Sequence, residues 1–446
     1  MYLIDKDISI IGAGLVGSLL SIYLSKQGSK VSIYERRKDM RLDTTLAGRS
    51  INLSLSKRGI NALSEVGITD EIMSIAMPMY HRTMHSANGD ITIQPYGKKD
   101  EAIFSVSRAS LNIILMDLAE KHNVEINFEA KCQSIDFDST KLTLLDHDVY
   151  SDLIFAADGA GSVVRKQMKS TSLIKSSEDF IDCGYKELTI PSNVDGTHKI
   201  DNQSLHIWPR KSYMIIALPN LDGTFTCTLF FPMRGKNSFE SLVSELDVMN
   251  LFNNNFQDLV PLIPDISSQY FTNPTASLGL VNCYPWSSEN VVLIGDSCHA
   301  TVPFYGQGMN SGFEDCFLLN EFINNSQSIE RFKELLPRYL KARKVDTDAM
   351  QSLSMENFIV MRDKTADQNF LLQKKIERWF SEKNPTKWTP LYSMVSFSNI
   401  PYSKALAIGE FQEKVMEQVM KIDNLDLTNN SLEVESVIIS LLKLKN

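Results

Sequence analysis

The pattern of hydrophobic and polar positions near the N-terminus predicts a βαβ unit. Asp7–Ile11 is a short apolar run that predicts a buried strand, and apolar residues at helical spacing follow Gly14 as far as Leu24. Gly28 ends the predicted helix, and Val31–Tyr34 predicts the second strand. In such a unit the turn after the first strand lies at the carboxyl edge of a parallel sheet, where ligands bind.

The middle of the chain is richer in alternating runs that predict strands, and its last part is helical. Asn88-Gly89 is typical of a hairpin turn, and Asp222-Gly223 of a turn between two strands. Ser107–Lys121 predicts a helix, because its large apolar residues share one face. From about Phe313 onward the spacing is almost entirely helical. The expected strands are Met84–Pro95 (both arms of the hairpin), Val124–Phe128, Lys141–Leu145, Asp152–Ala156, Ser204–Trp208, Tyr213–Leu218 and Phe225–Phe231.

This order of elements predicts an α/β fold with a discontinuous, Rossmann-like dinucleotide-binding domain. We expect that domain to comprise residues 1–85, 101–180 and 276–345. Residues 86–100 and 181–275 would form an inserted antiparallel β-sheet domain that binds the substrate, and residues 346–446 a C-terminal helical region.

The turn after the first predicted strand has the residues that a dinucleotide pyrophosphate needs. Gly12 permits the tight turn, Gly14 lets the backbone approach the phosphates, and Gly17 lets the helix pack on the strands. The helix N-terminus directs unpaired N–H groups at the phosphates, and Glu35 stands where a carboxylate binds ribose hydroxyls. The alternative is a glycine-rich turn that only connects a strand to a helix, but it does not explain why Glu35 closes the unit.

Composition narrows the class of protein without identifying it. With 446 residues, 43% hydrophobic and 22% charged, the chain is typical of a globular protein with more than one core. Its net charge of −9 argues against nucleic acid as a partner. The six cysteines form no CxxC pair and His81, His85 and His299 have no ligand spacing, so we expect no metal site. We recognise neither a signal peptide nor a transmembrane segment, and therefore expect a cytoplasmic location.

Two later segments each place an aspartate after a predicted strand. Asp158-Gly159 follows the strand Asp152–Ala156 and leads into a helix, and Gly295-Asp296 follows a second apolar run and precedes the loop Gly306–Asn310. Taken singly, Asp158 is well explained as a turn residue and Asp296 as a helix N-cap. In this order behind the N-terminal glycine motif, however, the segments resemble the class A (single-component) flavin-dependent aromatic hydroxylases.

Shorter segments resemble, within that family, the kynurenine 3-monooxygenases. The resemblance extends over roughly residues 5–400. It departs at Val360, where it implies an acidic residue just before Met361. The segments that carry it are Ala47–Leu53, His81–His85, Gln94–Gly97, Ser107–Asn112, Phe225–Phe230, Pro303–Asn310, Glu356–Phe358, Met361–Lys364 and Pro390–Ser393.

The resemblance implies FAD as the cofactor, bound by residues from all three motifs. Asp296 would bind the ribityl hydroxyls, and the loop Gly306–Asn310 with the helix after it would donate backbone N–H groups to the flavin ring. The implied cofactor-binding residues are Gly12, Gly14, Val16, Gly17, Glu35, Arg36, Arg49, Arg108, Asp158, Asp296, Gly306, Gln307, Gly308, Met309 and Asn310.

The resemblance also implies a substrate, L-kynurenine, which is an amino acid with an aniline ring. Arg82 would pair with the substrate carboxylate, while Tyr96, Asn357 and Tyr392 would hydrogen-bond to the amino-acid end. The apolar residues implied around the aromatic ring are Leu205, Ile216, Leu218, Phe230, Pro303 and Phe304. Without the resemblance, ordinary sheet core explains these apolar residues, and a surface salt bridge explains Arg82.

The implied reaction is hydroxylation of L-kynurenine at ring position 3, a step of tryptophan catabolism and NAD biosynthesis, with O2 and NADPH consumed. It needs no dedicated catalytic side chain, because the flavin supplies the chemistry while Arg82, Tyr96 and Tyr392 position the substrate. No second glycine motif follows a strand, so NADPH would bind transiently. Two alternatives are a flavin hydroxylase for another aromatic acid, and a non-enzymatic binding protein on the same fold, as in the GDP-dissociation inhibitors of small GTPases. The sequence leaves the oligomeric state open.

Overall fold

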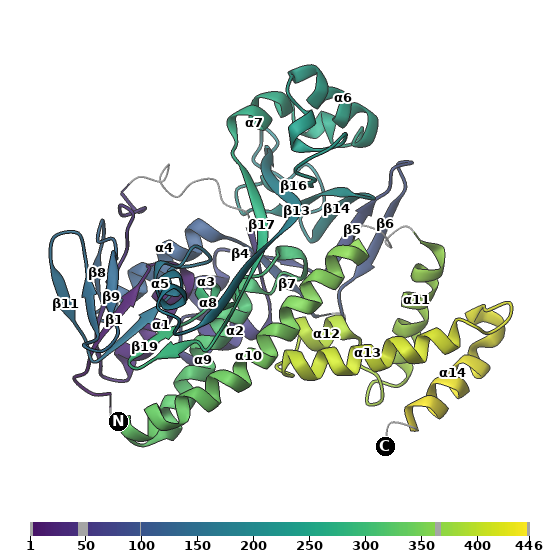
Figure 1. Cartoon of the computed structure of the whole chain (residues 1–446). Helices are drawn as coiled ribbons and strands as arrows, with labels where there is room; N and C mark the ends of the chain where they lie inside the picture. The colour runs from purple at the N-terminus through teal and green to yellow at the C-terminus, as the bar shows by residue number, and fades with distance from the viewer. Residues whose placement is uncertain (1–2, 43–51, 99, 362–366, 444–446) are drawn as a thin grey trace.

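The computed structural model describes residues 3–42, 52–98, 100–361 and 367–443. Figure 1 shows an α/β unit around the N-terminus, a second sheet rising beside it, and C-terminal helices that extend away from the α/β unit.

The first sheet confirms the predicted βαβ unit. It has six strands in the order β18 (Ser287–Ser288), β19 (Val291–Leu293), β12 (Leu153–Ala156), β1 (Asp7–Ile11), β2 (Lys30–Tyr34) and β8 (Glu125–Asn127). All of them run parallel except the edge strand β18, and α1 (Leu15–Lys26) connects β1 to β2. Because β1, β12 and β19 are neighbours, the glycine turn and both aspartate turns meet at one edge of this sheet.

Helices α1, α4 (Arg108–Lys121) and α9 (Gly308–Ser326) pack together in the α/β unit (Figure 1). Apolar side chains at helical spacing form the contact, and Leu19, Ile22 and Leu115 have no exposed surface. The predicted helix Ser107–Lys121 is therefore confirmed, with Ser107 as its N-cap.

Gly17 shows how closely α1 packs on the glycine turn. A Cβ at Gly17 would lie 2.0 Å from the carbonyl oxygen of Gly12, which is backbone and cannot turn away. We therefore expect Gly17→Ala to lower the free energy of unfolding by at least ~1–3 kcal/mol, the usual cost of overpacking. Thermal unfolding measures this loss, and an unfolding temperature equal to that of the unchanged protein would contradict the packing.

Two smaller sheets and several short helices complete the α/β unit. One sheet has the three strands β3 (Asn52–Leu55), β7 (Ile103–Ser107) and β4 (Ala76–Met79), and the other has β11 (Asp148–Tyr150), β10 (Lys141–Thr143) and β9 (Ser134–Asp136). The short helices are α2 (Lys57–Glu65), α3 (Thr69–Met73), α5 (Val163–Ser170) and α8 (Asp296–His299).

The second sheet has seven strands and is antiparallel at all but one of its pairings. Their order is β17 (Thr275–Tyr284), β13 (Lys175–Ile190), β16 (Phe225–Phe231), β15 (Tyr213–Pro219), β14 (Ser204–Arg210), β5 (His81–His85) and β6 (Ile91–Pro95). β5 and β6 form the hairpin predicted around Asn88-Gly89. The expectation of a purely antiparallel sheet is wrong at β14 and β5, which run parallel because the chain enters β5 from the α/β unit and not through a hairpin.

Alternation along β14 gives this sheet two different faces. Leu205 and Ile207 face a cavity beside the α/β unit. Trp208 lies on the opposite face, in an apolar cluster covered by α6 (Glu245–Asn255) and α7 (Ile266–Thr272), which lie at the top of Figure 1. One face is therefore free to line a site while the other is ordinary core.

Three of the expected domain boundaries do not match the extent of the second sheet, because one lies at the end of a strand of that sheet and two lie inside strands. β5 already belongs to that sheet, although the expected boundary lies after residue 85. β13 and β17 are long strands paired with each other from the α/β unit into the second sheet, so residues 175–180 and 276–284 also belong to it. The division into domains stays a proposal, with these boundaries moved accordingly.

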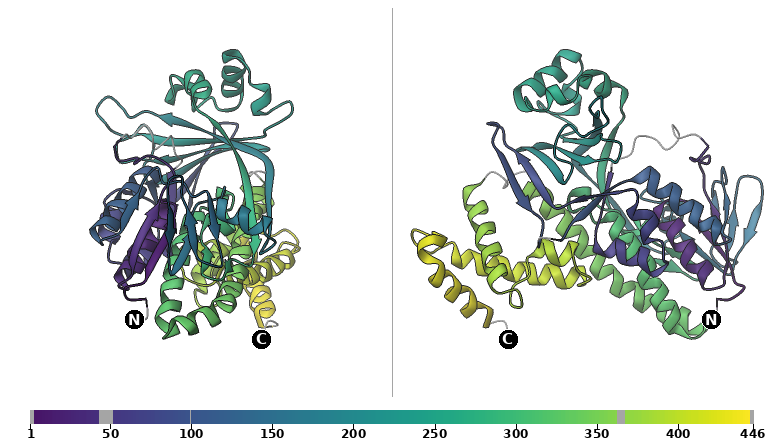
Figure 2. Two further views of the ribbon diagram at one scale, coloured as in Figure 1. Left: turned by 60° about the vertical axis from the view of Figure 1, so that its left-hand side comes forward. Right: turned by 180° about the vertical axis from the view of Figure 1, so that it is seen from behind.

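The C-terminal part is helical, as predicted, and Figure 2 shows it from two further sides. The helices are α10 (Ile329–Ile359), α11 (Gln368–Lys383), α12 (Leu391–Ser396), α13 (Tyr402–Val419) and α14 (Leu427–Lys443). α12 and α13 pack against α10 around Tyr402, which is fully buried. Within the described residues, every helix is too short or too polar to cross a membrane.

Candidate active site

A cavity of about 700 Å³ lies between the carboxyl edge of the first sheet and the inner face of the second. Its size falls in the range of small-molecule and cofactor sites, roughly 300–1,000 Å³. One end is lined by the glycine and aspartate turns of the α/β unit, and the other by side chains of the second sheet and the C-terminal helices. Most of the residues predicted to form a site therefore converge on this one space.

The glycine turn leaves room for a ligand at Gly14 but not at its neighbours. A Cβ at Gly14 would meet no atom within 4 Å, whereas one at Gly12 would lie 2.7 Å from the carbonyl oxygen of Ala157. Gly14 lines the cavity and is the N-cap of α1, so no side chain caps the first N–H groups of this helix. An open cradle beside an uncapped helix N-terminus fits a pyrophosphate.

Glu35 lines the same end of the cavity and also holds the glycine turn. One carboxylate oxygen accepts the N–H of Ala13 at 3.0 Å, and the other accepts the backbone and side-chain N–H groups of Arg37, each at 2.9 Å. Burial raises the pKa of Glu35, but the hydrogen bonds and charge of Arg37 outweigh it and leave the pKa below its usual value. Glu35 is therefore a carboxylate at neutral pH, with acceptor capacity remaining for hydroxyl groups.

The contacts of Asp158 agree with both interpretations of the sequence, a turn residue and a residue that binds a ligand. Its Oδ2 accepts the N–H of Val163 at 2.8 Å, which is the local role of a turn residue. Its Oδ1 is buried and has no hydrogen-bond partner among the residues that the structure describes, although Asp158 lines the cavity. Burial raises the pKa of this carboxyl. An orphaned buried oxygen beside an open cavity is what a ligand hydroxyl or a bound water would satisfy.

Asp296 is not the N-cap of the helix that it opens, which removes the alternative interpretation of this residue. Gly295 is the N-cap, with φ +66°, and Asp296 is an exposed first residue of α8 that lines the cavity. The carboxylate is thereby available to a ligand.

The loop Gly306–Asn310 contributes its backbone, while two of its side chains are used by the protein. Gln307 accepts a hydrogen bond from the Tyr402 hydroxyl at 2.9 Å, and Asn310 bonds to the backbone of Ser54 and Ser56. Both side chains are buried within the protein, and neither residue lines the cavity. The expected contacts of these two residues to a ligand therefore stay a prediction.

The expected cofactor-binding residues divide into three groups. Arg49 lies outside the described residues. Gly17, Gln307 and Asn310 support the site from behind and do not line the cavity. The residues that line it are Gly12, Gly14, Val16, Glu35, Arg36, Arg108, Asp158, Asp296, Gly306, Gly308 and Met309.

At the other end of the cavity, Arg82 lies over two stacked tyrosines. Its guanidinium carbon is 4.9 Å from the centre of the Tyr96 ring and 5.0 Å from that of Tyr392, and the two rings stack at 5.1 Å. No carboxylate among the described residues forms an ion pair with Arg82, so the salt-bridge alternative is not what the structure shows. Burial raises the pKa of both phenols, which leaves them neutral O–H donors at neutral pH. The arrangement is a cation with hydrogen-bond donors around it, suited to a carboxylate.

An apolar slot in the same cavity is lined by side chains of the second sheet and of the turn Pro303–Tyr305. Phe230 and Phe304 contact each other with ring centres 5.0 Å apart. Ile216 and Leu218 project from the same face of β15, as their spacing requires. All the residues that the resemblance implied around an aromatic ring line the cavity here. They are Leu205, Ile216, Leu218, Phe230, Pro303 and Phe304.

The end of α10 completes this part of the cavity. Asn357 lines it and donates a hydrogen bond to the backbone oxygen of Phe304, and Met361 lines it one helical turn further on. Val360 does not line the cavity and ends α10 as its C-cap. The side chain at this position therefore lies outside the cavity lining.

Sequence reasoning missed several lining residues, and local geometry could have found some of them. Ile207 follows Leu205 by one strand period, and Met361 follows Asn357 by one helical turn. Tyr185 could be found only through its pairing with Phe230 across β13 and β16. The segment of β17 that lines the cavity contains no motif that would have identified it from the sequence. Its lining residues are Ser277, Leu278, Gly279, Leu280 and Val281.

Among the described residues, no group of three or more histidine, cysteine, aspartate or glutamate side chains is arranged to hold a metal ion.

Comparison with known proteins gives a family and a set of close relatives. The family described as FAD binding domain matches residues 5–352. Kynurenine 3-monooxygenase of Flavobacterium johnsoniae is 48% identical over 443 residues, covering 98% of each chain. The enzyme of the same name from Flavobacterium psychrophilum is 48% identical and covers 99% of each chain. That from Stenotrophomonas maltophilia is 40% identical over 95% of each.

Solved structures with low sequence identity share the fold. The tetrameric form of 2-methyl-3-hydroxypyridine-5-carboxylic acid oxygenase superposes with a TM-score of 0.69 at 19% identity, over 83% of this chain and 95% of the other. PqsL of P. aeruginosa, solved in complex with 2-aminobenzoylacetate, has a TM-score of 0.61 at 18% identity, over 80% and 97%.

Proposed function

This chain belongs to the FAD binding domain family and, within it, to the kynurenine 3-monooxygenases, and we propose on that basis that it hydroxylates L-kynurenine at ring position 3. O2, NADPH and a proton are consumed with L-kynurenine, and the products are 3-hydroxykynurenine, NADP+ and water. FAD, when bound, supplies the transfer of reducing equivalents from NADPH and the activation of O2. The protein's own residues bind, orient and shield the reactants.

The α/β end of the cavity fits FAD. The open cradle at Gly14 would take the pyrophosphate, and Glu35 would take ribose hydroxyls. Asp296 would bind the ribityl chain, and the backbone N–H groups at the start of α9 would face the flavin ring. The unsatisfied Oδ1 of Asp158 supports a polar ligand in this space.

The single observation that carries the substrate assignment is Arg82, a cation without an ionic partner among the described residues, placed beside the stacked rings of Tyr96 and Tyr392. It would pair with the substrate carboxylate, with Tyr96, Tyr392 and Asn357 as further hydrogen-bonding groups. The aniline ring would then lie in the slot of Phe230, Phe304 and their neighbours, between Arg82 and the FAD site. This arrangement positions the ring without a catalytic acid or base.

Product analysis tests the proposed function directly. L-kynurenine, NADPH and air with the FAD-loaded protein should give a product heavier by one oxygen atom and co-eluting with 3-hydroxykynurenine. NADPH oxidation measured with a panel of other aromatic acids separates a hydroxylase of different specificity, which would respond more strongly to one of those. Protein that folds but binds no FAD would favour the non-enzymatic alternative.

The compartment is part of this proposal. Five of the six cysteines, Cys132, Cys227, Cys283, Cys298 and Cys316, are free and buried thiols, which supports a reducing, cytoplasmic environment.

A further inference from the structure

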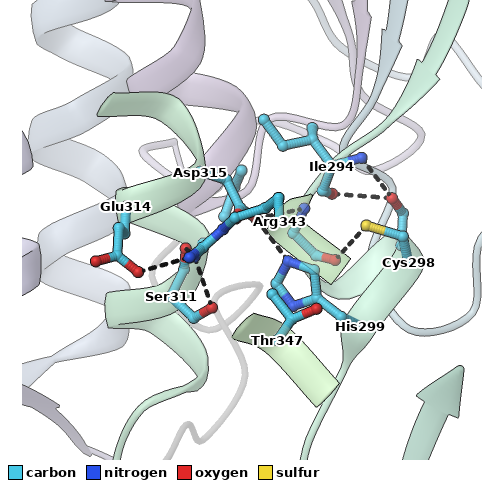
Figure 3. A network of polar contacts seen from close by, with 12 residues as sticks. Ile294, Cys298, His299, Ser311, Glu314, Asp315, Arg343 and Thr347 are labelled. Atoms are coloured by element: carbon cyan, nitrogen blue, oxygen red, sulfur yellow. Dashed lines mark hydrogen bonds and ion pairs between the residues drawn. The ribbon is translucent and has the colours of Figure 1, made fainter. Parts of the chain in front are cut away.

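A buried network of charged side chains lies behind the Gly295–Asp296 turn, where α8, α9 and α10 meet (Figure 3). Asp315 from α9 and Arg343 from α10 are each 4% exposed, and His299 from α8 is 2% exposed. Glu314 pairs with Arg343 and continues the network to Arg58 on α2. Neither Asp315 nor Arg343 lines the cavity, so these side chains act on a ligand only through other groups.

Asp315 connects the Gly295–Asp296 turn to Arg343. Its Oδ2 accepts the backbone N–H of Gly295 at 3.2 Å and the Nε2–H of His299 at 2.6 Å. Its Oδ1 accepts the Nε–H of Arg343 at 2.7 Å. Burial raises the pKa of Asp315, but the electrostatic interactions and hydrogen bonds with His299 and Arg343 outweigh it and keep the pKa below its usual value. The carboxylate that holds this turn is therefore ionised, and its hydrogen bonds are charge-assisted.

Arg343 extends the connection to the start of α9. Its second terminal nitrogen donates to the backbone oxygen of Ser311 at 3.1 Å and to the hydroxyl of Ser311 at 3.2 Å. Ser311 lies in the first turn of α9, two residues after Met309, which lines the cavity together with Gly308. Asp315 thus joins the Gly295–Asp296 turn to α9, and the guanidinium of Arg343 fixes this carboxylate and the first turn of α9 against α10.

We propose that Asp315 and Arg343 are positioning residues for the cofactor, which hold the Gly295–Asp296 turn and the first turn of α9 at the spacing that one FAD molecule requires. The inference rests on the proposed function, because it takes those two segments to bind FAD. A buried ion pair adds little net stability compared with apolar residues of the same shape. What it supplies is a fixed distance and direction between two chain segments, because a planar fork and a carboxylate pair in few geometries.

FAD affinity of the apoprotein tests the proposal without recourse to turnover. Asp315→Asn keeps the shape of the side chain but removes the negative charge that accepts the hydrogen bonds of Gly295, His299 and Arg343. Arg343→Lys keeps a positive charge, but the side chain is too short to reach Asp315 and Ser311 together. We expect the FAD dissociation constant to rise by about tenfold or more in Asp315→Asn and by a smaller factor in Arg343→Lys, since each loses charge-assisted contacts. The absorption bands of the flavin that still binds should be broadened, because its surroundings are less uniform.

Arg210→Met is the matched control. Arg210 is also a buried arginine and donates to the backbone oxygens of His85 and Asn255, on the side of the second sheet away from the cavity. We expect this variant to unfold at a lower temperature while its FAD dissociation constant stays within about twofold, as for independent distant sites.

Three results would overturn the proposal. Asp315→Asn and Arg343→Lys could both bind FAD as tightly as the unchanged protein. They could unfold at lower temperature with unaltered FAD affinity and flavin spectrum, which would make the network purely structural. Unchanged protein that binds no FAD at all would instead overturn the proposed function, and this inference with it. If Asp315→Asn does not fold, Arg343→Lys together with Ser311→Ala decides the same question from the other end of the connection.

Discussion

Gly14→Val should give a folded protein that no longer retains FAD. The valine side chain would extend into the open cradle where the pyrophosphate has to approach the N-terminus of α1. It meets no protein atom there at Cβ, so the fold has little reason to change. We expect the FAD dissociation constant to rise by more than about 100-fold, equivalent to an overlap costing over ~3 kcal/mol.

The measurement is the flavin absorbance of purified Gly14→Val after incubation with excess FAD and gel filtration. Thermal unfolding of the apoproteins of this variant and of the unchanged protein is measured beside it. Gly17→Ala is the matched control, because its added Cβ would meet backbone and not ligand space. That variant should lose stability, whereas Gly14→Val should lose cofactor. A yellow Gly14→Val protein with full FAD content would remove the glycine turn from the cofactor site.

Arg82→Met should raise the KM for L-kynurenine steeply and leave FAD bound. Methionine keeps an unbranched apolar stem against the rings of Tyr96 and Tyr392 but removes the charge that would meet the substrate carboxylate. Loss of a charge-assisted contact costs ~1.5–3 kcal/mol, which lowers kcat/KM by about 10- to 150-fold. The loss should fall mainly on KM, because the carboxylate is distant from the reacting ring and is held equally in ground and transition states.

Steady-state kinetics with L-kynurenine and NADPH varied separately provide the measurement. The KM for NADPH and the FAD content should stay unchanged, which separates a substrate contact from general damage to the site. The KM of Arg82→Lys for L-kynurenine should lie between those of the unchanged protein and Arg82→Met, because an ammonium keeps the charge without the bidentate geometry. An unchanged KM for L-kynurenine in Arg82→Met would exclude Arg82 from the substrate site.

The candidate site shows where local sequence reasoning is sufficient. The residues around Gly12, Gly14 and Glu35 lie in one βαβ unit, so their spacing along the chain fixes their relation in space. The hairpin at Asn88-Gly89 and the shared face of Ile216 and Leu218 follow from local geometry in the same way.

Other parts of the site depend on contacts between distant segments. The β5–β6 hairpin brings Tyr96 to Arg82, but only the docking of α12 brings the distant Tyr392 to stack on Tyr96 and to approach Arg82. The pairing of β13 with β17 brings Ser277–Val281 into the cavity wall without any motif in that segment. The side chains of Gln307 and Asn310 are held by Tyr402, Ser54 and Ser56, which only the tertiary structure brings to them, while their expected backbone contacts to a cofactor stay a prediction.

The sequence by itself determined the α/β class, the three motif-bearing turns and the family, because turn chemistry and the periods of helices and strands act over short stretches of chain. The tertiary structure decided that these turns meet at one edge of a sheet, that Arg82 is left without an ionic partner among the described residues, and that Asp315 and Arg343 support the Gly295–Asp296 turn. The physical reason is that burial and charge pairing depend on which distant segments pack together, and the pattern of any one segment does not contain that information.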